Sequence, residues 1–543
     1  WTVTCGGSSC GSFGPATTSN EQLTTYMAPT AIPPGGNVTV AVTSVTDPTK
    51  SASTSIAITA AAATLANGTY VFQIAGQPGS NASFYTGVLV ASNGAITGGE
   101  QDTAYYTDDG FDDGSNLYTA QQAITGGTYA TTPDGNMEVR IQVGGAELET
   151  INGTLRTGAQ GFVAGLDGMP ATGTLDLQTS TAAPAGGYAL SLFGGDQYND
   201  PAWIGGVVNI DSAGGISGKG SELDVLDGEA GLSGEDAVGA STVSAPDPYG
   251  RVTIKLYPGT GSSTLQPVYL AGYVVDATHM RLIETEDAVD DANFQGVLGG
   301  TALGQGTNTG KFTMASVAGT SYVFGAQGSD EHGPLDIAGV LTLGANGTVT
   351  GTLSWNDVSG GGAQDPVSGQ WTVDATGKMT VSNLTSGSSP VYSMRVYLTG
   401  DGNGLLLSDD SDDIFAGQVF EQQATPFTAA SFSGTYGLNG MEYVPSGLYG
   451  ELGVEGPLTL SASGGSDAVA GFVDNANGAA DFAVSGSFAA SATGVFTGSL
   501  AGFAPGAGTT GDGFTLYVVD GTQAVVIETG NQQLVLGRLE KVQ

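Results

Sequence analysis

The chain has 543 residues, which at about 150 residues per domain allows roughly three or four domains. Its 52 acidic and 12 basic residues give a net charge of −40, and a surface of that sign repels phosphate backbones and anionic membranes. Nucleic-acid binding is therefore excluded as a main function, and because no apolar stretch is long enough for a transmembrane helix we expect no membrane insertion.

Residues 1–62 form a segment of their own, with short β-branched runs that predict strands. The features that set it apart are a strand starting at Trp1, the pair Cys5 and Cys10, the run Thr25-Tyr26-Met27-Ala28-Pro29, and a last strand after Lys50-Ser51-Ala52-Ser53. Together these features resemble the C-terminal part of a bacterial Ig-like (Big-type) domain. The resemblance implies a partial Ig-like sandwich over residues 1–62.

Ig-like domains of this type carry two further strands before the strand that begins here at Trp1. A sandwich without them would expose core side chains and unpaired backbone groups, which is costly in water. Two explanations stay open. The strands lie on a segment outside this sequence, as we also expect of the export signal, or another chain supplies a strand by β-augmentation. The second would make the protein a polymer subunit whose partners are copies of itself.

Cys5 and Cys10 lie close together on a loop of glycine and serine. A zinc site needs four nitrogen or sulfur ligands, and the nearest histidine in the sequence is the distant His279. In a small exported domain two neighbouring cysteines are normally joined. We therefore predict a structural disulfide between Cys5 and Cys10.

The rest of the chain consists of four copies of one pattern. Each copy begins with a tyrosine, and a strand that starts with glycine follows 17 to 20 residues later. The tyrosines are Tyr70, Tyr188, Tyr322 and Tyr436, and the glycines are Gly87, Gly206, Gly339 and Gly456. Asn-Gly or Gly-Gly turns come next, and these favour tight hairpins because their residues accept positive φ. The repeats predict domains at 63–181, 182–312, 313–428 and 429–543.

Strand spacing predicts the architecture of each copy. The last copy reads as about eight short strands in roughly 110 residues, each joined to the next by a tight turn. This pattern is typical of an antiparallel up-and-down β-barrel, whose closure removes exposed strand edges. Large apolar side chains alternate at 70–74 and 514–518, so we expect filled interiors. The predicted fold is all-β: a partial Ig-like sandwich followed by four tandem barrel-like modules, arranged as beads along the chain.

Two dense acidic loops are the candidate metal sites, because hard cations such as Ca²⁺ take six to eight oxygen ligands. The first loop contains Asp108, Asp109, Asp112 and Asp113, and the second covers residues 408–413. Neither fits the twelve-residue EF-hand loop, and solvated loops without an ion remain the alternative. The two histidines, His279 and His332, are too few for a metal centre of the common kinds.

Two catalytic motifs match by letters and fail by context. Residues 7–11 fit the G-x-S-x-G nucleophile elbow but precede a strand rather than a helix, and residues 506–511 fit G-x-G-x-x-G but lie between two strands. Nothing places two carboxylates as a glycosidase requires. We therefore expect no enzyme and no cofactor, with calcium as the exception.

These observations favour a non-enzymatic, secreted bacterial protein of the cell surface. The expected role is a structural subunit of an extracellular filament or of a biofilm or surface layer, with β-strand complementation at the incomplete Ig-like domain as a possible mode of assembly. The alternative is an adhesin, or a protein that binds a glycan, a polysaccharide or a small ligand at the barrel mouths.

Overall fold

The computed structural model divides into two compact units, Trp1–Ala62 and Ala63–Gln543. It describes residues 1–542 except for 8–9, 20–21, 23, 28, 30–32, 34–36, 58–63, 77–82, 108–115, 132–135, 146, 158, 168, 196–200, 217–219, 228–230, 236–240, 258–266, 286–295, 331, 358, 387–388, 410–412, 444–451, 464, 476–481, 502–511 and 531–533. The described residues form antiparallel strands, apart from short helical turns, so the predicted all-β fold is confirmed. Among them no helix has the length and apolar character needed to cross a membrane.

The first unit, residues 1–62, contains two small sheets. Its strands are β1 (Thr2–Thr4), β2 (Ser12–Gly14), β3 (Thr25–Met27), β4 (Asn37–Thr43) and β5 (Ser51–Ala57), paired in the orders β1-β4-β5 and β2-β3. Val38 and Val40 alternate inward from β4, and partly buried side chains pack against them, among them Phe13 and Tyr26. The likeness of this unit to an Ig-like domain stays a prediction.

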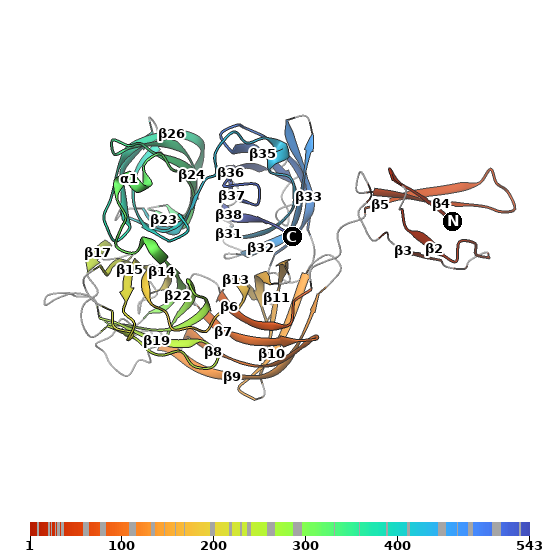
Figure 1. The fold of residues 1–543 in the computed structure, drawn as a ribbon. Helices are drawn as coiled ribbons and strands as arrows, with labels where there is room; N and C mark the ends of the chain where they lie inside the picture. Colours follow the sequence, from red (N-terminus) through yellow and green to blue (C-terminus); the bar gives the residue numbers. More distant parts are fainter. Residues whose placement is uncertain are drawn as a thin grey trace. The chain divides into compact units, whose positions relative to one another are not determined.

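The second unit contains four successive modules (Figure 1). Module 1 has β6 (Gly68–Gly76), β7 (Ser83–Ser92), β8 (Ala95–Thr107), β9 (Asn116–Thr131), β10 (Asn136–Val143), β11 (Glu147–Thr157), β12 (Gln160–Leu166) and β13 (Met169–Leu177). Module 2 has β14 (Gly186–Gly195), β15 (Pro201–Ile210), β16 (Glu222–Asp227), β17 (Gly231–Glu235), β18 (Thr242–Val243), β19 (Arg251–Leu256), β20 (Val268–Asp276), β21 (His279–Glu284) and β22 (Val297–Gly304).

The remaining two modules follow a short helical connection, η1 (Gly306–Asn308) and α1 (Met314–Val317). Module 3 has β23 (Ser321–Asp330), β24 (Gly333–Leu343), β25 (Thr348–Asp357), β26 (Gly360–Val373), β27 (Lys378–Ser386), β28 (Ser389–Leu398), β29 (Gly404–Ser408) and β30 (Ile414–Glu421). After η2 (Ala429–Ser431), module 4 has β31 (Gly434–Tyr443), β32 (Leu452–Ser463), β33 (Ser466–Asn475), β34 (Phe482–Ala489), β35 (Val495–Ala501), β36 (Asp512–Val518), β37 (Gln523–Glu528) and β38 (Leu534–Lys541).

Modules 1, 3 and 4 are closed barrels in which each strand pairs with its neighbours in the chain and the first strand pairs with the last. Module 2 is a nine-stranded sheet with β17 and β18 at its edges. An isolated bridge joins Thr242 of β18 to Gly215, between β15 and β16, so this sheet curls towards closure as well. The predicted series of four barrel-like modules is therefore confirmed.

Turn glycines at equivalent places in modules 2, 3 and 4, and the four repeated tyrosines, have structural roles that the modules share. Gly250, Gly377 and Gly494 have φ values of +84°, +93° and +83°, which residues with a side chain rarely adopt. The four repeated tyrosines all lie in the apolar interiors of their own modules. Each tyrosine is at most 5% exposed. The signature found in the sequence thus marks the point where each module starts to build its core.

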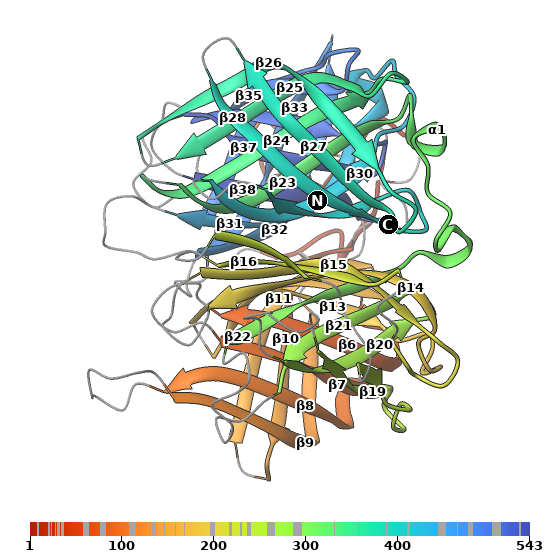
Figure 2. The same ribbon diagram turned by 90° about the vertical axis from the view of Figure 1, so that its left-hand side faces the viewer.

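The four modules also pack against one another, always through the same pair of faces. The first strands of one module lie on the last strands of the next: β6, β7 and β8 on β20, β21 and β22; β14 and β15 on β28 and β29; β23, β24 and β25 on β36, β37 and β38. Figure 2 shows β14 and β15 at the border with module 3.

The same contact also joins the last module to the first, with β31 and β32 on β11, β12 and β13. The expected row of beads is therefore wrong, because module 4 packs on module 1. A contact between two different faces gives a ring when its rotation closes and an open array when it does not. Here it closes after four modules.

Candidate functional site

The barrel interiors, where a ligand or an active site would be expected, are filled in the part of the chain that the structure describes. Each module holds its own apolar cluster, and in module 3 this includes the fully buried Trp371, Phe324 and Phe415. Filled interiors leave the faces and ends of the modules as the places where polar chemistry is concentrated.

A buried carboxylate lies between modules 1 and 2. Arg251 of module 2 donates two hydrogen bonds to Asp102 of module 1, from Nε to Oδ2 at 2.6 Å and from Nη2 to Oδ1 at 2.9 Å. The hydroxyl of Tyr273 donates to Asp102 Oδ2 at 2.6 Å. Burial and the charge of Asp102 raise the pKa of Tyr273 well above its usual value, so this hydroxyl keeps its proton and remains a donor.

The contact between modules 2 and 3 repeats this arrangement. Asp224 of module 2 accepts from the hydroxyl of Tyr397 at 2.6 Å and forms ion pairs with Lys378, at 2.8 Å, and with Arg395. Lys378 follows the turn at Gly377 as Arg251 follows the turn at Gly250, so the two sites occupy equivalent places. We call Asp102 and Asp224 the inter-module carboxylates.

At the equivalent place between modules 3 and 4 the described residues form no ion pair, but a tyrosine is again present. The hydroxyl of Tyr517 lies 2.7 Å from that of Ser354. The residue after the turn at Gly494 is Val495, which joins an apolar cluster between the two modules. A neutral version of the contact therefore replaces the charged one, with the same geometry.

A glutamine joins each of the first three modules to the next. Gln178, Gln305 and Gln422 each follow the last strand of a module, and their side-chain amides donate to two carbonyls of the following module. One of these carbonyls precedes a turn glycine, and a methyl group on any of the three glycines would lie within 2.9 Å of the amide nitrogen. At the equivalent place in module 4 the chain has Val542, whose amide donates to Thr435 as Gln178 donates to Thr69.

A chain of polar contacts passes through all four modules. Arg538 of module 4 donates to Gln418 of module 3 at 3.1 Å and pairs with Glu540. Glu540 also pairs with Arg156 of module 1. In module 1, Arg156 donates to Gln160, which donates to Asp176 at 2.8 Å, and Asp176 accepts from Arg281 of module 2 at 2.7 Å.

Half of the scarce cations therefore serve the contacts between modules. Of the 12 lysines and arginines in the sequence, six bridge two modules in the part of the chain that the structure describes: Arg156, Arg251, Arg281, Lys378, Arg395 and Arg538. Their partners are buried carboxylates or, for Arg538, an amide. In a chain with a net charge of −40 these cations offset repulsion where acidic faces meet.

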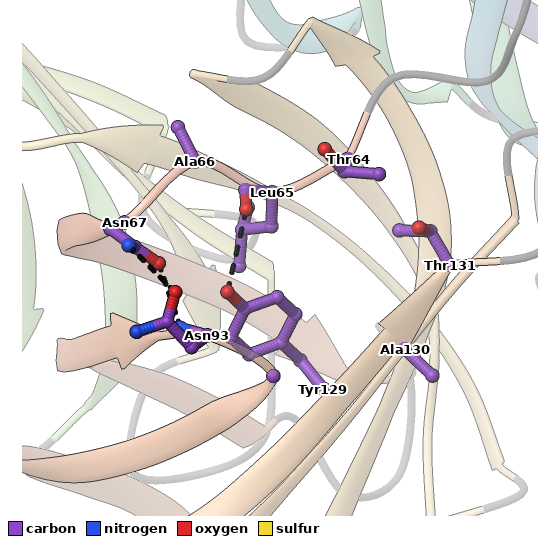
Figure 3. Close-up of a pocket in the computed structure, with 9 residues that line it drawn as sticks. Thr64, Leu65, Ala66, Asn67, Asn93, Tyr129, Ala130 and Thr131 are labelled. Atoms are coloured by element: carbon purple, nitrogen blue, oxygen red, sulfur yellow. Dashed lines mark hydrogen bonds between the residues drawn. The ribbon is translucent and has the colours of Figure 1, made fainter.

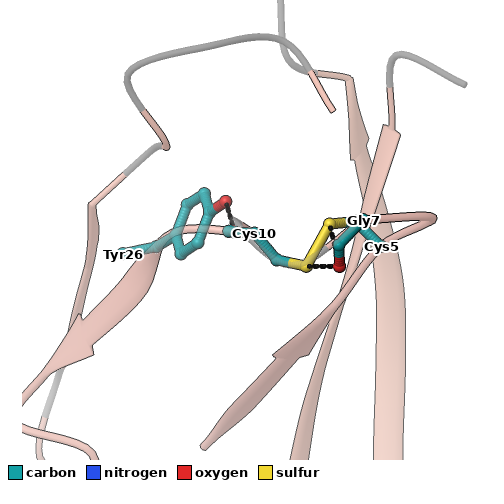
Figure 4. Close-up of a disulfide and its surroundings, with 4 residues drawn as sticks. All are labelled: Cys5, Gly7, Cys10 and Tyr26. Carbon is teal, nitrogen blue, oxygen red and sulfur yellow. Dashed lines mark hydrogen bonds between the residues drawn. A yellow bond between two sulfur atoms is a disulfide. The ribbon is translucent and has the colours of Figure 1, made fainter. Parts of the chain in front are cut away.

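The two cysteines of unit 1 form a disulfide, with Cα atoms 5.5 Å apart (Figure 4). Tyr26 lies beside it and donates from its hydroxyl to the carbonyl of Cys10 at 2.6 Å. Both sulfur atoms are used in the bond, so the pair holds the loop before β2 in place and offers no thiolate for a metal.

A pocket of about 440 Å³ lies outside the barrel interior, beside the turn between β7 and β8 of module 1 (Figure 3). Its polar groups bond mainly to one another: Asn67 donates to Asn93 at 3.2 Å, and the backbone amide of Asn93 donates back to Asn67 at 2.7 Å. The hydroxyl of Tyr129 donates to the carbonyl of Leu65 at 3.4 Å. These bonds tie the segment that enters module 1 to the β7–β8 turn and to β9.

A mixed group of carboxylates and imidazole lies at one end of module 3. Asp330, His332 and Asp357 come from the connections β23–β24 and β25–β26, and one possible ligand atom of each lies within 4.8 Å of the others. Asp357 is buried, whereas the side chain of His332 is 47% exposed. Burial and the neighbouring carboxyl of Asp357 raise the pKa of Asp330.

The structure places the predicted acidic loops in different situations. Asp108, Asp109, Asp112 and Asp113 lie outside the described residues, so the calcium site suggested there stays a prediction. In the second loop, Asp409 pairs with Arg395 at 2.8 Å, and the carboxyl of Asp413 contributes, with those of Asp330 and Asp357, to raising the pKa of Tyr392.

Sequence reasoning missed the group of Asp330, His332 and Asp357 because these residues lie in separate connections of module 3. A usable signal existed: in an up-and-down barrel the first, third and seventh connections of a module lie at the same end. Asp330 and His332 belong to the first connection of module 3, Asp357 to the third and Asp413 to the seventh.

A further carboxyl, that of Asp336, is buried on the side of module 3 that module 4 covers. It alternates along β24 with Leu335 and Ile337, which point into the barrel core, and it is 3% exposed. Gln327 donates to its Oδ1 at 3.0 Å. Burial raises the pKa of Asp336 to about 7.

Removing an inter-module carboxylate should destabilise the protein strongly. In Asp224→Ala, Lys378, Arg395 and Tyr397 lose their shared acceptor. Lys378 keeps its pair with Glu222 and Arg395 keeps its pair with Asp409, so the loss costs about 1.5–3 kcal/mol. We expect a lower midpoint of urea unfolding. Asp211→Ala, in an exposed turn of the same module, is the matched control and should cost much less. Equal midpoints for the two variants would contradict this role.

Asp336 should make stability fall between about pH 4 and pH 7. Its carboxyl titrates near 3.8 when unfolded and near 7 when folded, so the folded state holds the proton more tightly and loses stability as the pH rises through this window. Asp336→Asn should therefore unfold at a higher temperature than the wild type at pH 8, by about 1–4 kcal/mol in unfolding free energy, and equal it near pH 4. The exposed Glu138→Gln is the control. A pH profile that is the same in D336N and wild type would rule the effect out.

Comparisons with known proteins add little to this picture. No family model and no curated protein matches the chain. A solved structure from Nostoc punctiforme PCC 73102, a protein of unknown function from the DUF3598 family, is 12% identical, with a TM-score of 0.17, over 43% of this chain and 100% of that chain. A TM-score that low carries no argument about function.

Proposed function

We propose that this chain is a non-enzymatic extracellular structural protein, a subunit of a cell-surface filament or surface layer. One observation carries the proposal: the described residues fill the interiors of the modules with apolar side chains, while the buried charges lie between modules and join them. Polar groups that an enzyme would gather around a substrate are here paired with one another across module contacts.

The ring directs assembly towards unit 1. Each module uses one face for the module before it and another for the module after it, and closure of module 4 on module 1 occupies both kinds of face. A subunit of this kind cannot grow by adding more modules at those faces. Contacts between copies then fall to other surfaces, and residues 1–62 supply the surface with the most exposed apolar side chains.

Unit 1 has two features that suit β-strand complementation. In its described residues, β1 and β5 are the outer strands of the sheet β1-β4-β5, and unpaired strand edges pair readily with another chain. Five large apolar side chains stand out as exposed in the described chain, and three belong to this unit: Trp1 at 36%, Met27 at 53% and Val45 at 83%. The disulfide of this unit suits an oxidising, extracellular location.

The alternative is an adhesin or glycan-binding protein, and the pocket beside the β7–β8 turn of module 1 favours it. Its volume of about 440 Å³ falls within the range of small-ligand sites. Amides of Asn67 and Asn93 and the ring of Tyr129 line it, which suits the hydroxyls and the apolar face of a sugar. Binding of purified polysaccharides, lost in Asn93→Ala, would support this function.

Assembly should depend on the exposed apolar side chains of unit 1. The double variant Met27→Lys, Val45→Lys should raise the concentration needed for assembly about tenfold or more, because it removes apolar contacts and adds charge. Leu148→Lys, which changes a side chain 55% exposed on module 1, is the matched control and should assemble like the wild type.

Sedimentation velocity and electron microscopy of the purified full chain measure the outcome. Regular fibres or layers from wild type and L148K, but not from the double variant, are the predicted result. Dispersed wild-type monomers at every concentration, or equal assembly of all three proteins, would contradict the proposal.

A further inference from the structure

The interior of module 1 is polar towards one end, at places where modules 2 and 3 are apolar. In each of these modules the repeated glycine of the second strand is paired with a residue of the third strand. That residue is Leu223 in module 2 and Leu353 in module 3, both in apolar cores, but it is Gln101 in module 1. Two residues further along the same strand, Thr103 of module 1 takes the place of Val225 of module 2. An apolar core position is therefore an amide in module 1.

Gln101 reaches across the interior of the barrel. Its Nε2 donates to Oε1 of Glu149 at 2.9 Å and to Oε2 at 3.2 Å. Gln101 lies on β8 and Glu149 on β11, and in the barrel these strands are separated by β9 and β10. A direct contact between them must therefore pass through the interior. Both side chains are buried, Gln101 completely.

The amide oxygen of Gln101 is the second and independent observation. This Oε1 atom is buried and has no hydrogen-bond partner among the described residues. Buried acceptors without a partner are uncommon, because each costs desolvation energy. The amide nitrogen already donates to Glu149, so the oxygen is the atom of this side chain that still needs a partner. Only a hydrogen-bond donor can satisfy it.

A pair of tyrosines marks the mouth of this end of the barrel. Tyr105 and Tyr118 lie directly opposite each other on β8 and β9, with ring centroids 4.8 Å apart. Tyr105 shares one face of β8 with Thr103 and Gln101, because side chains alternate along a strand. The exposed fraction rises from 0% at Gln101 and 3% at Thr103 to 42% at Tyr118. This row of side chains thus leads from the interior to solvent.

We propose that the end of module 1 formed by Gln101, Glu149, Tyr105 and Tyr118 binds a neutral saccharide. A sugar hydroxyl donates to Oε1 of Gln101, further hydroxyls donate to the carboxylate of Glu149, and the apolar face of the sugar ring packs on the tyrosines. Aromatic side chains with a few fixed polar groups are typical of small-ligand sites. The site concerns the second unit and does not depend on the assembly role proposed for residues 1–62.

The charge of the site distinguishes a neutral sugar from other ligands. An anionic sugar is repelled by Glu149 and by the net charge of −40. An organic cation such as a polyamine is the alternative, since a carboxylate and tyrosine rings attract it. Salt screens the attraction of such a cation but has little effect on hydrogen bonds and ring contacts with a neutral ligand.

The test exposes the labelled, purified full chain to an array of neutral, anionic and aminated glycans. The neutral oligosaccharide that binds most strongly, and spermidine, are then titrated calorimetrically at low and high salt. We expect saturable binding of the neutral oligosaccharide that changes little with salt. Gln101→Leu places here the leucine of modules 2 and 3, and it should weaken binding at least about fivefold. Tyr118→Ala changes an exposed side chain, so it should weaken binding similarly without affecting the fold.

The matched control is Tyr257→Ala, which removes one ring from another aromatic pair, Tyr257 and Tyr269 of module 2, with centroids 6.1 Å apart. Y257A should bind the oligosaccharide as the wild type does, and urea unfolding checks that each variant is folded. No binding on the array, binding of anionic glycans or spermidine alone, or neutral binding that is unchanged in Q101L and Y118A would overturn the site. Binding lost in Asn93→Ala but kept in Q101L and Y118A would assign the sugar to the pocket beside the β7–β8 turn instead.

Discussion

Polar contacts buried between the modules, which are ion pairs at three of the four contacts, are the interaction on which the rest of the structure depends. The chain carries a net charge of −40, so its faces repel one another unless cations are placed between them. Arg251 at Asp102 and Arg395 at Asp224 occupy equivalent places, each beside a tyrosine hydroxyl. Breaking such a pair is costly, and a shift of one module face along the other would break it. We therefore infer that these pairs fix the register in which two apolar sheet faces meet.

The sequence predicted what is local and repeated. Core tyrosines such as Tyr322 and the strand-starting glycines such as Gly339 recur at similar places in every module, because every module builds the same core from the same strands. The sequence could not predict that Asp102 pairs with Arg251, which lies 149 residues away along the chain. Nothing in local pattern says which module faces which, so the closed ring, its polar chain and the group around Asp330 emerge only in three dimensions.

Filled interiors and a closed ring give the two units different parts in the proposed function. Residues 63–543 form a block whose equivalent faces are already in use, from module 1 round to module 4. Residues 1–62 keep outer strands and exposed apolar side chains in their described part. A compact block joined to a unit with exposed apolar side chains suits a subunit that repeats along a surface assembly. In such a subunit the buried polar groups serve to join the modules.

Scanning calorimetry of the full chain tests most directly whether the modules are locked into one body. For modules that share buried ion pairs, glutamine contacts and a polar chain through all four, the account predicts one dominant transition, with a calorimetric enthalpy close to the van't Hoff enthalpy. Independent modules would instead unfold separately. A calorimetric enthalpy near four times the van't Hoff value would contradict the account.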